Sequence, residues 1–353
     1  MNRTKHMTLS RRHFLGTGAA LGAATFAMPG ILRAQGSREL IVVSFAGQLQ
    51  EPHRWLADQM EADISGLTVR LVPSESQDIV AQIKAAQGFS PYDVMPNGEP
   101  PHLIAQTEGY IVPLDAAAVP NAANVDPKFM ELANGFGVPT SYSLIGIAYN
   151  EAMVDTPPTS WEDLFAPELK GKVGFPRASS NLGLGALVAM ARLRGGSESD
   201  LEPGWAALEE LQPVIGRSPS QLIQMLEREE IAMAPIWNND AAGAAGKGLP
   251  IRFVMPDPGP IVVLSMTSQI KGTQHPDLVH EWMNRLLSPE YQARAADAPY
   301  FFGPTVTGVE VPSAAAEYTP TTPEAMAKLQ TVDWSVIAPQ RGEIVDRFDR
   351  TYS

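Results

Sequence analysis

Short apolar runs alternate with helix-like segments at the start of the chain, and this alternation constrains the fold more than any other feature. The apolar runs have the length of strands, and the segments between them carry apolar residues at helical spacing. The predicted strands are 40–45, 67–72 and 92–95, and the predicted helices lie near 51–62 and around Ile79 and Ile83. Strands that alternate with helices form a parallel sheet with helices on its faces. The sequence therefore predicts an α/β fold.

The spacing of strands and helices becomes less regular after Pro139. Further strands are predicted at 144–149, 173–175, 231–236, 251–255 and 261–266, and further helices at 182–194, 222–228, 278–287, 290–296 and 342–352. A short helix capped by Ser160 is expected to end at Pro167, before a basic turn into the strand 173–175. The proline-rich stretch 304–323 is expected to be a surface connection. The length of the chain fits about two domains.

The first 34 residues are predicted to be an export signal rather than part of the fold. The sequence SRRHFL, residues 10–15, fits the twin-arginine pattern, and an apolar Gly/Ala-rich run follows as far as Met28. This run is too short and too rich in Gly and Ala to span a bilayer well. Ala34 precedes the expected cleavage point, and a plain secretory signal is the alternative. We therefore expect a periplasmic protein, exported by the twin-arginine route.

The charge and the cysteine content exclude several classes of protein. The chain has a net charge of −13, and residues 1–34 contain five basic groups and no acid, so the mature chain carries −18. Such a surface argues against nucleic acid and anionic lipid as partners. The absence of cysteine excludes disulfides, thiolate metal sites and cysteine catalysis.

Motifs for catalysis or for metal binding are also missing from the sequence. There is no G-x-G-x-x-G after a strand, no P-loop and no G-x-S-x-G. The four histidines of the mature chain, His53, His102, His275 and His280, form no pair at metal-ligand spacing. These features predict no enzyme, no cofactor and no metal site. Because the twin-arginine route often exports cofactor enzymes, an exported enzyme stays open as an alternative.

Six stretches of the chain, in order, resemble bacterial extracellular solute-binding proteins of ABC transporters, most of all the polyamine and iron types. The stretches are IVVSFAG, YDVMPNGEPPHLIAQTEGYIVPLD, GVPTSYSLIGIAYNEAMV, SWEDLFAPELKGKVGFP, IAMAPIWNND and SPEYQARAADAPYFFGPT. They cover nearly all of the mature chain. No single stretch is diagnostic, but six in the family's order make the resemblance specific.

The resemblance implies a two-lobed periplasmic-binding-protein type II fold. Each lobe would be a mixed, mostly parallel sheet flanked by helices, with the ligand cleft between the lobes. Lobe 1 would comprise residues 35–142 and 263–311, and lobe 2 residues 143–262 and 312–353. The lobes would close on a small-molecule ligand and dock on an ABC permease in the inner membrane, with the protein a monomer. A periplasmic sensor that passes its ligand signal to a receptor is the other reading.

The resemblance also implies which residues face the ligand, because ligands bind beyond the carboxyl ends of the strands. Each position keeps a structural alternative, such as an ordinary turn, a core side chain or a lobe surface. Trp237 would form an aromatic wall. The other implied positions outside the 177–181 loop are Ser44, Phe45, Ala46, Gly47, Asn97, Glu99, Ser141, Tyr142, Asn238, Asp240, Tyr300 and Phe301.

The chain differs from polyamine-type binding proteins at two places where the resemblance implies ligand contacts, and these differences change which ligand is expected. Relatives of that type carry acids on the strand matching 261–266 and after the strand matching 173–175, whereas this chain has no acid at 261–266 and offers Arg177, Ser179 and Ser180 after 173–175. A cation beside hydroxyls and a helix N-terminus favours a carboxylate or amino-acid-like ligand, with a polyamine as the alternative. Arg177 could instead pair with a nearby acid on the surface. Because no Tyr-Tyr pair is present, iron is not expected.

Overall fold

The computed structural model describes residues 38–45, 49–74, 76–320 and 322–352 of the 353-residue chain. Its strands are β1 (Arg38–Ser44), β2 (Leu67–Pro73), β3 (Val94–Gly98), β4 (Val138–Asn150), β5 (Gly174–Pro176), β6 (Val214–Gly216), β7 (Met233–Trp237), β8 (Ile251–Val254) and β9 (Ile261–Gln269). Its helices are α1 (Gln50–Asp63), α2 (Ser76–Ala85), α3 (Glu99–Thr107), α4 (Pro127–Leu132), α5 (Asn181–Leu193), α6 (Glu202–Leu211), α7 (Pro219–Glu227), α8 (Asn238–Gly246), α9 (Pro276–Leu286), α10 (Pro289–Ala296), α11 (Pro323–Ala327) and α12 (Trp334–Tyr352). None of these helices is long and apolar enough to cross a membrane. The predicted export signal, residues 1–34, lies outside the described residues.

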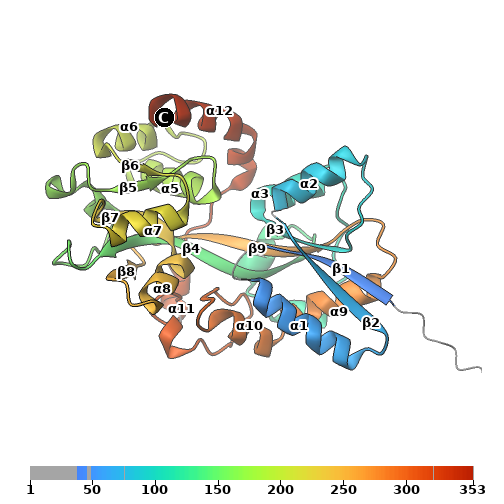
Figure 1. Ribbon diagram of the computed structural model, residues 1–353. Coiled ribbons are helices and arrows are strands. Elements are labelled where there is room, and N and C mark those ends of the chain that lie inside the picture. The colour runs from blue at the N-terminus through green and yellow to red at the C-terminus, as the bar shows by residue number, and fades with distance from the viewer. Residues whose placement is uncertain (1–37, 46–48, 75, 321, 353) are drawn as a thin grey trace, which may run out of the picture. The chain divides into compact units, whose positions relative to one another are not determined.

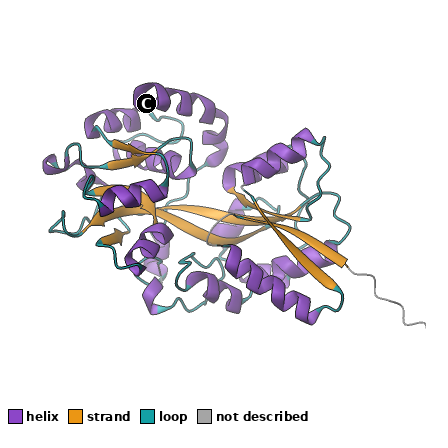
Figure 2. Ribbon diagram, in the orientation of Figure 1, coloured by secondary structure: helices purple, strands orange, loops and turns teal. Residues whose placement is uncertain are grey.

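Seven strands form one mixed sheet in the order β2-β1-β3-β9-β4-β7, with β8 also paired to β4 (Figures 1 and 2). β1 pairs parallel with β2 and β3, as the alternation of strands and helices predicts. β4 and β9 pair antiparallel with each other and with their other neighbours. β5 and β6 form a separate parallel pair, which a bridge from Val173 to Met233 joins to β7. Among these strands, parallel pairing therefore occurs only between β1 and its neighbours β2 and β3, and between β5 and β6.

The long strands β4 and β9 belong to both ends of this sheet. Their shared register runs from Val138 opposite Thr267 to Ile145 opposite Ile261. Beyond Ile145, β4 pairs with β7 and β8, whereas the far half of β9 pairs with β3. We call the part built on β1–β3 with α1–α3, α9 and α10 the first lobe, and the part built on β5–β8 with α5–α8 and α12 the second lobe. β4 and β9 connect the two lobes, and Figure 1 shows them side by side between the two sets of helices.

The apolar cores follow this division in part. One cluster lies wholly in the first lobe and includes Val43, Ile79 and Met95. A second cluster packs α5, α6 and α12 around the Trp161 and Phe175 side chains in the second lobe. The largest cluster runs along β4 and β9 and includes residues from both lobes. Because this core is shared, the described residues from Arg38 onward form one compact unit.

The start of the second lobe folds as its sequence predicts. Ser160 caps a short 3-10 helix, Trp161–Phe165, and the Asp163 carboxylate accepts the Ser160 backbone N–H in return, which forms a capping box. The Trp161 indole is buried, and its Nε1 donates to the Gly259 carbonyl at 3.1 Å. This segment is thereby fixed against the connection that leads into β9.

Several helical segments differ from the sequence prediction. α3, α4 and α11 were not predicted, and the prolines after Glu99 occupy the first turn of α3, where a missing N–H costs nothing. The Gly/Ala-rich run 238–246 forms α8, because small residues let it pack against β4, β7 and β8. α6 was not predicted, and α12 begins at Trp334 instead of 342, with Pro339 inside it. Packing against the rest of the fold therefore determines the structure of these segments.

We predict that Gly303→Ala destabilises the junction between the lobes. A Cβ at Gly303 would overlap the Tyr142 ring, which is fully buried on β4. Overpacking of this kind lowers the free energy of unfolding by about 1–3 kcal/mol, measured by urea denaturation. Gly342→Ala is the matched control, because Gly342 lies exposed in α12 with open space around it, and alanine there should raise stability by up to about 1 kcal/mol. Equal effects of the two substitutions would contradict the prediction.

Candidate functional site

Most of the sequence-predicted site residues lie at the carboxyl ends of strands. Ser44 is the last residue of β1, Asn97 lies one residue before the end of β3, and Trp237 is the last residue of β7. Arg177 follows β5 directly. Ala46 and Gly47, predicted for the loop after β1, lie outside the described residues. The strand ends of both lobes therefore contribute to one candidate site.

The loop after β5 touches the first lobe. Ser180 caps α5 by accepting the Gly183 N–H at 3.1 Å. A Cβ at Gly98, the last residue of β3, would lie 3.3 Å from Asn181 Nδ2. The predicted loop 177–181 therefore meets the predicted turn after β3, as expected of residues from opposite lobes.

Arg177 points elsewhere than the sequence analysis expects. Its Nη2 lies 2.9 Å from Asp349 Oδ1 on α12, and both side chains are about two-fifths exposed, at 38% and 42%. This is the surface pairing that the sequence left open as the alternative. A ligand anion at Arg177 would have to displace Asp349.

Arg341, which the sequence analysis did not consider, approaches the same loop from α12. Its Nη1 donates to Asn181 Oδ1 at 2.9 Å and its Nη2 donates to the Ser179 carbonyl at 2.5 Å. Burial lowers the pKa of this guanidinium below its ordinary value. Across the described ranges Arg341 has no ion pair with a carboxylate. A half-buried cation without an anion therefore lies next to Ser179 and Asn181.

Glu99 joins the two lobes at the first turn of α3. Its Oε2 accepts the Leu264 N–H on β9 at 3.0 Å and the Trp334 Nε1–H of α12 at 3.1 Å. The residue is only 5% exposed. Burial raises the pKa of this carboxyl to about 8, although both hydrogen bonds act in the other direction. The carboxyl thus holds its proton at neutral pH unless a cation approaches it.

The first turn of α8 carries a second acid in the second lobe. Asp240 is half-buried, and in the part of the chain that the structure describes it forms no hydrogen bond or ion pair. Burial raises its pKa to about 6, with the Lys247 charge acting against the shift. Asn238, two residues earlier, is fully buried and structural: its Oδ1 accepts the Leu144 N–H, and its Nδ2 donates to the Phe301 and Tyr318 carbonyls. Trp237 is half-buried against the core of the second lobe.

The predicted residues of the first lobe are largely engaged with one another. The Ser44 hydroxyl lies 2.8 Å from His53 Nδ1, and both side chains are buried. The Tyr300 hydroxyl donates to Glu51 at the start of α1, which also receives Arg294 at 2.8 Å. Phe45 and Tyr300 are half-buried against the shared core. Their partly open aromatic rings are surfaces of this lobe that a ligand could contact.

Three more predicted positions are buried in the structure. Asn97 is fully buried, and its Nδ2 lies 3.4 Å from Ser268 Oγ. Ser141 is 3% exposed on β4, and the Phe301 ring is buried against Tyr318. The alternatives to a ligand contact were a solvated turn for Asn97 and a lobe surface for Phe301, and both side chains are buried instead.

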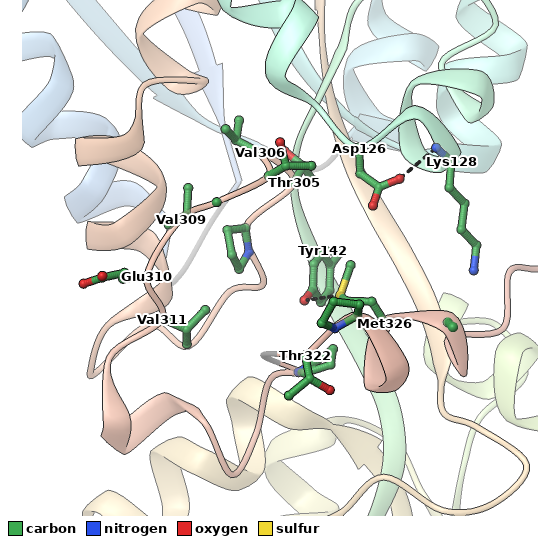
Figure 3. Close-up of a pocket in the computed structure, with 16 residues that line it drawn as sticks. Asp126, Lys128, Tyr142, Thr305, Val306, Val309, Glu310, Val311, Thr322 and Met326 are labelled. Atoms are coloured by element: carbon green, nitrogen blue, oxygen red, sulfur yellow. Dashed lines mark hydrogen bonds between the residues drawn. The ribbon is translucent and has the colours of Figure 1, made fainter.

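Tyr142 lies apart from the strand ends, in a pocket beside β4 (Figure 3). The pocket has a volume of about 770 Å³, and its walls come from the start of α4, from the stretch 304–311 and from 320–327. The Tyr142 ring is buried against Phe129, and its hydroxyl reaches Met326 Sδ at 3.6 Å. Burial raises the pKa of this phenol above its ordinary value. None of the other predicted site residues lines this pocket.

The strand ends, the shared long strands and the contacts between lobes define a two-lobed solute-binding protein with a type II periplasmic-binding-protein fold. The sequence matches the model for the family "bacterial extracellular solute-binding protein" over residues 55–327, and the chain belongs to this family. Both expectations from the resemblance, the family and the fold class, are therefore confirmed.

Curated relatives are similar to this chain over only part of its length. The norspermidine sensor of Vibrio cholerae is 29% identical over 125 residues, which is 35% of this chain and 34% of that protein. The putrescine-binding periplasmic protein PotF of Escherichia coli is 25% identical over 221 residues, or 55% of this chain and 60% of that protein. The matches thus span between about a third and three-fifths of these relatives.

Solved structures agree in fold over most of the chain. A putative extracellular solute-binding protein from Bordetella parapertussis superposes with a TM-score of 0.77 at 24% identity, covering 89% of this chain and 99% of that one. The spermidine/putrescine substrate-binding protein PotD from Streptococcus pneumoniae gives 0.74 at 21% identity, covering 90% and 100%. At these identities the likeness establishes the fold.

We predict that Glu99 makes stability depend on pH above neutrality. Its folded pKa of about 8 exceeds the ordinary value of 4.5, so between these values the folded state holds a proton that the unfolded state has released. Stability must therefore fall as the pH rises through this window. Between pH 7 and 8 the unfolding free energy should fall by about 1 kcal/mol. Urea denaturation at the two pH values measures the fall.

Amide variants provide the control for this measurement. Glu99→Gln should abolish the fall between pH 7 and 8. Asp240→Asn should preserve it, because the pKa of Asp240, about 6, leaves that carboxyl ionised throughout the range. Buried His53, whose pKa is lowered to about 4, is neutral in the folded protein at these pH values, and the charged fraction of its unfolded form changes stability over this range by only about 0.1 kcal/mol, in the opposite direction. A fall that persists in Glu99→Gln would contradict the assignment.

Proposed function

We propose that this protein is the substrate-binding component of an ABC importer, working in the periplasm after export by the twin-arginine route. It captures a small organic solute by closure of the lobes 35–142 plus 263–311 and 143–262 plus 312–353, and carries out no chemistry on it. Family membership and the fold support this role. Contacts from Glu99 to Trp334 and from Gly98 to Asn181 connect the lobes where closure would act. The proposed partners are the ligand and an inner-membrane permease, with the binding protein a monomer.

We infer that the ligand carries at least one ammonium group. The observation that carries this inference is Asp240, an acid without a partner among the described residues, three positions after the Trp237 ring. Burial makes its ionised form costly, and a ligand cation would offset that cost. An aromatic residue and an acid at the start of the same helix would also suit an alkylammonium chain. The curated relatives named for norspermidine and putrescine support a polyamine as one form of this ligand.

An amino-acid-like ligand is the second candidate, and Arg341 favours it. A carboxylate would meet a half-buried guanidinium that has no carboxylate partner in the described ranges. The guanidinium could bind such a group with two parallel hydrogen bonds. Arg341 thus provides the cation that the sequence analysis assigned to Arg177.

Two other functions stay as alternatives. A periplasmic sensor would use the same fold and would differ only in its partner, and one curated relative is itself named as a sensor. Pull-down of the ligand-bound protein with membrane extracts would separate a permease from a receptor. An exported enzyme would convert a ligand on prolonged incubation, whereas the proposed binding protein returns it unchanged.

A thermal-shift screen of the mature chain against polyamines, ω-amino acids and small carboxylates tests the ligand class. A ligand of the folded state raises the melting temperature by mass action. We expect hits among compounds that carry an ammonium group and none among plain dicarboxylates. Arg341→Met should weaken an ω-amino acid at least about 30-fold and leave a polyamine nearly unaffected. Binding of dicarboxylates alone would refute the ammonium proposal.

We predict that Trp237 contacts the ligand. Trp237→Ala should weaken binding of the best screening hit by about 1–3 kcal/mol, because a large aromatic contact surface is lost. Isothermal titration measures the affinity, and circular dichroism checks that the variant is folded. An unchanged affinity would place Trp237 in the core of the second lobe.

A further inference from the structure

The strand β9 carries no acid of its own between Ile261 and Gln269, yet a carboxyl group is attached to this strand from outside. Glu99 reaches β9 from α3 and accepts the Leu264 backbone N–H at 3.0 Å. β3 and β9 are paired at this point, with Gly98 opposite Ser265. The carboxyl group therefore lies at the middle of the strand that connects the two lobes.

The two oxygens of Glu99 have different surroundings. Oε2 accepts both hydrogen bonds, one from Leu264 and one from the Trp334 indole. Oε1 receives no hydrogen bond from the described residues, and it is not one of the oxygens sealed from solvent without a partner. One oxygen is thus fixed by the protein, while the other has access to a ligand.

We propose that Glu99 binds an ammonium group of the ligand through Oε1, and that the hydrogen bond from Trp334 makes this contact depend on closure of the lobes. The proposal rests on the proposed function, an amine-bearing solute bound between the lobes. It makes Glu99, a residue of the first lobe, the anionic group beside a strand that has no acid of its own. Ligand binding and closure are then coupled through one side chain.

Trp334 is placed to serve as this connection. It begins α12, its ring is 2% exposed, and it belongs to the core of the second lobe. Leu103, one turn after Glu99 on α3, packs against the same core. Figure 1 shows the start of α12 next to α3. The Glu99–Trp334 hydrogen bond therefore joins the ligand-binding group of one lobe to the core of the other.

The charges around Glu99 leave it without a competing partner. His102 on α3 is engaged with Ser268 and the Ala133 carbonyl. Asp333 precedes Trp334 and accepts from Ser335, and Arg341 on α12 is engaged with the loop after β5. Burial and the two hydrogen bonds account for the pKa of the Glu99 carboxyl, and none of these charged groups shifts it.

A proton count during binding tests the proposal directly. Because Glu99 is protonated at pH 7 in the free protein, an incoming ammonium group should ionise it and release close to one proton per ligand. Isothermal titration at pH 7.0 in phosphate and in Tris, with putrescine and 4-aminobutanoate as probes, measures this release. Both probes carry ammonium groups that stay protonated at this pH.

Amide and aromatic substitutions distinguish a role in ligand binding from a role in stabilising the fold. Glu99→Gln should abolish the proton release and weaken putrescine at least about 30-fold. Asp240→Asn should weaken binding but keep the release near one proton, because its carboxyl is already ionised at pH 7. Trp334→Phe keeps the ring and removes the donor, and it should weaken binding about 3- to 30-fold while keeping the release. Melting temperatures of the ligand-free variants check the fold.

The outcomes distinguish this proposal from the proposed function. Binding of an amine without proton release, or with the same release in Glu99→Gln, overturns the role of Glu99 and leaves the amine-binding function standing. If neither probe nor any amine of the screen binds, the proposed function fails, and this inference fails with it. Equal affinity of Trp334→Phe and the unmodified protein overturns the link to closure alone.

Discussion

The antiparallel pairing of β4 with β9 is the interaction on which the other parts of the structure depend. Through these two strands the first lobe and the second lobe share one sheet and part of one core. Strands in a continuous hydrogen-bonded ladder resist separation but can twist and bend, since strand twist varies widely. Such a ladder would let the lobes change their angle without exposing the shared core, which is the mechanical requirement of the proposed capture by closure.

The shared strands also explain why the candidate site contains two acids that form no ion pair with the described residues. The carboxyl ends of β3 and β7 approach the β4–β9 pair from opposite lobes and bring Glu99 and Asp240 with them. Both carboxyl groups have raised pKa values because burial removes water, and for Asp240 the Lys247 charge offsets this only in part. In the free protein this costs stability. Under the proposed function, the same cost would become selectivity for cationic groups, because a ligand cation would offset it.

Much of the fold could be predicted from the sequence, because strands such as 67–72 and 231–236 are dense in apolar residues and their neighbours are turn formers. α8 could not, since its segment mixes alanine, a strong helix former, with Gly, Asn and Asp, which lower helix preference, and its small side chains give no pronounced apolar face. For the candidate site, the sequence predicted only that its residues lie at the carboxyl ends of strands. Arg341 was not, because it reaches Ser179 from 162 residues away in the sequence. The pairing of Arg177 with Asp349 could not be predicted for the same reason, since the two residues are 172 positions apart in the sequence.

Asn238 has a consequence for how affinity could change in this family. One buried amide holds β4 at Leu144 and, on the connection between α10 and α11, the backbone at Phe301 and at Tyr318. Observed affinity is the intrinsic affinity of the closed form multiplied by the population of that form. Under the proposed closure mechanism, a change at this joint would shift that population without altering the proposed ligand-binding side chains Glu99 and Asp240. Natural variation or directed evolution could thus adjust affinity across a wide range of solute concentrations while preserving specificity.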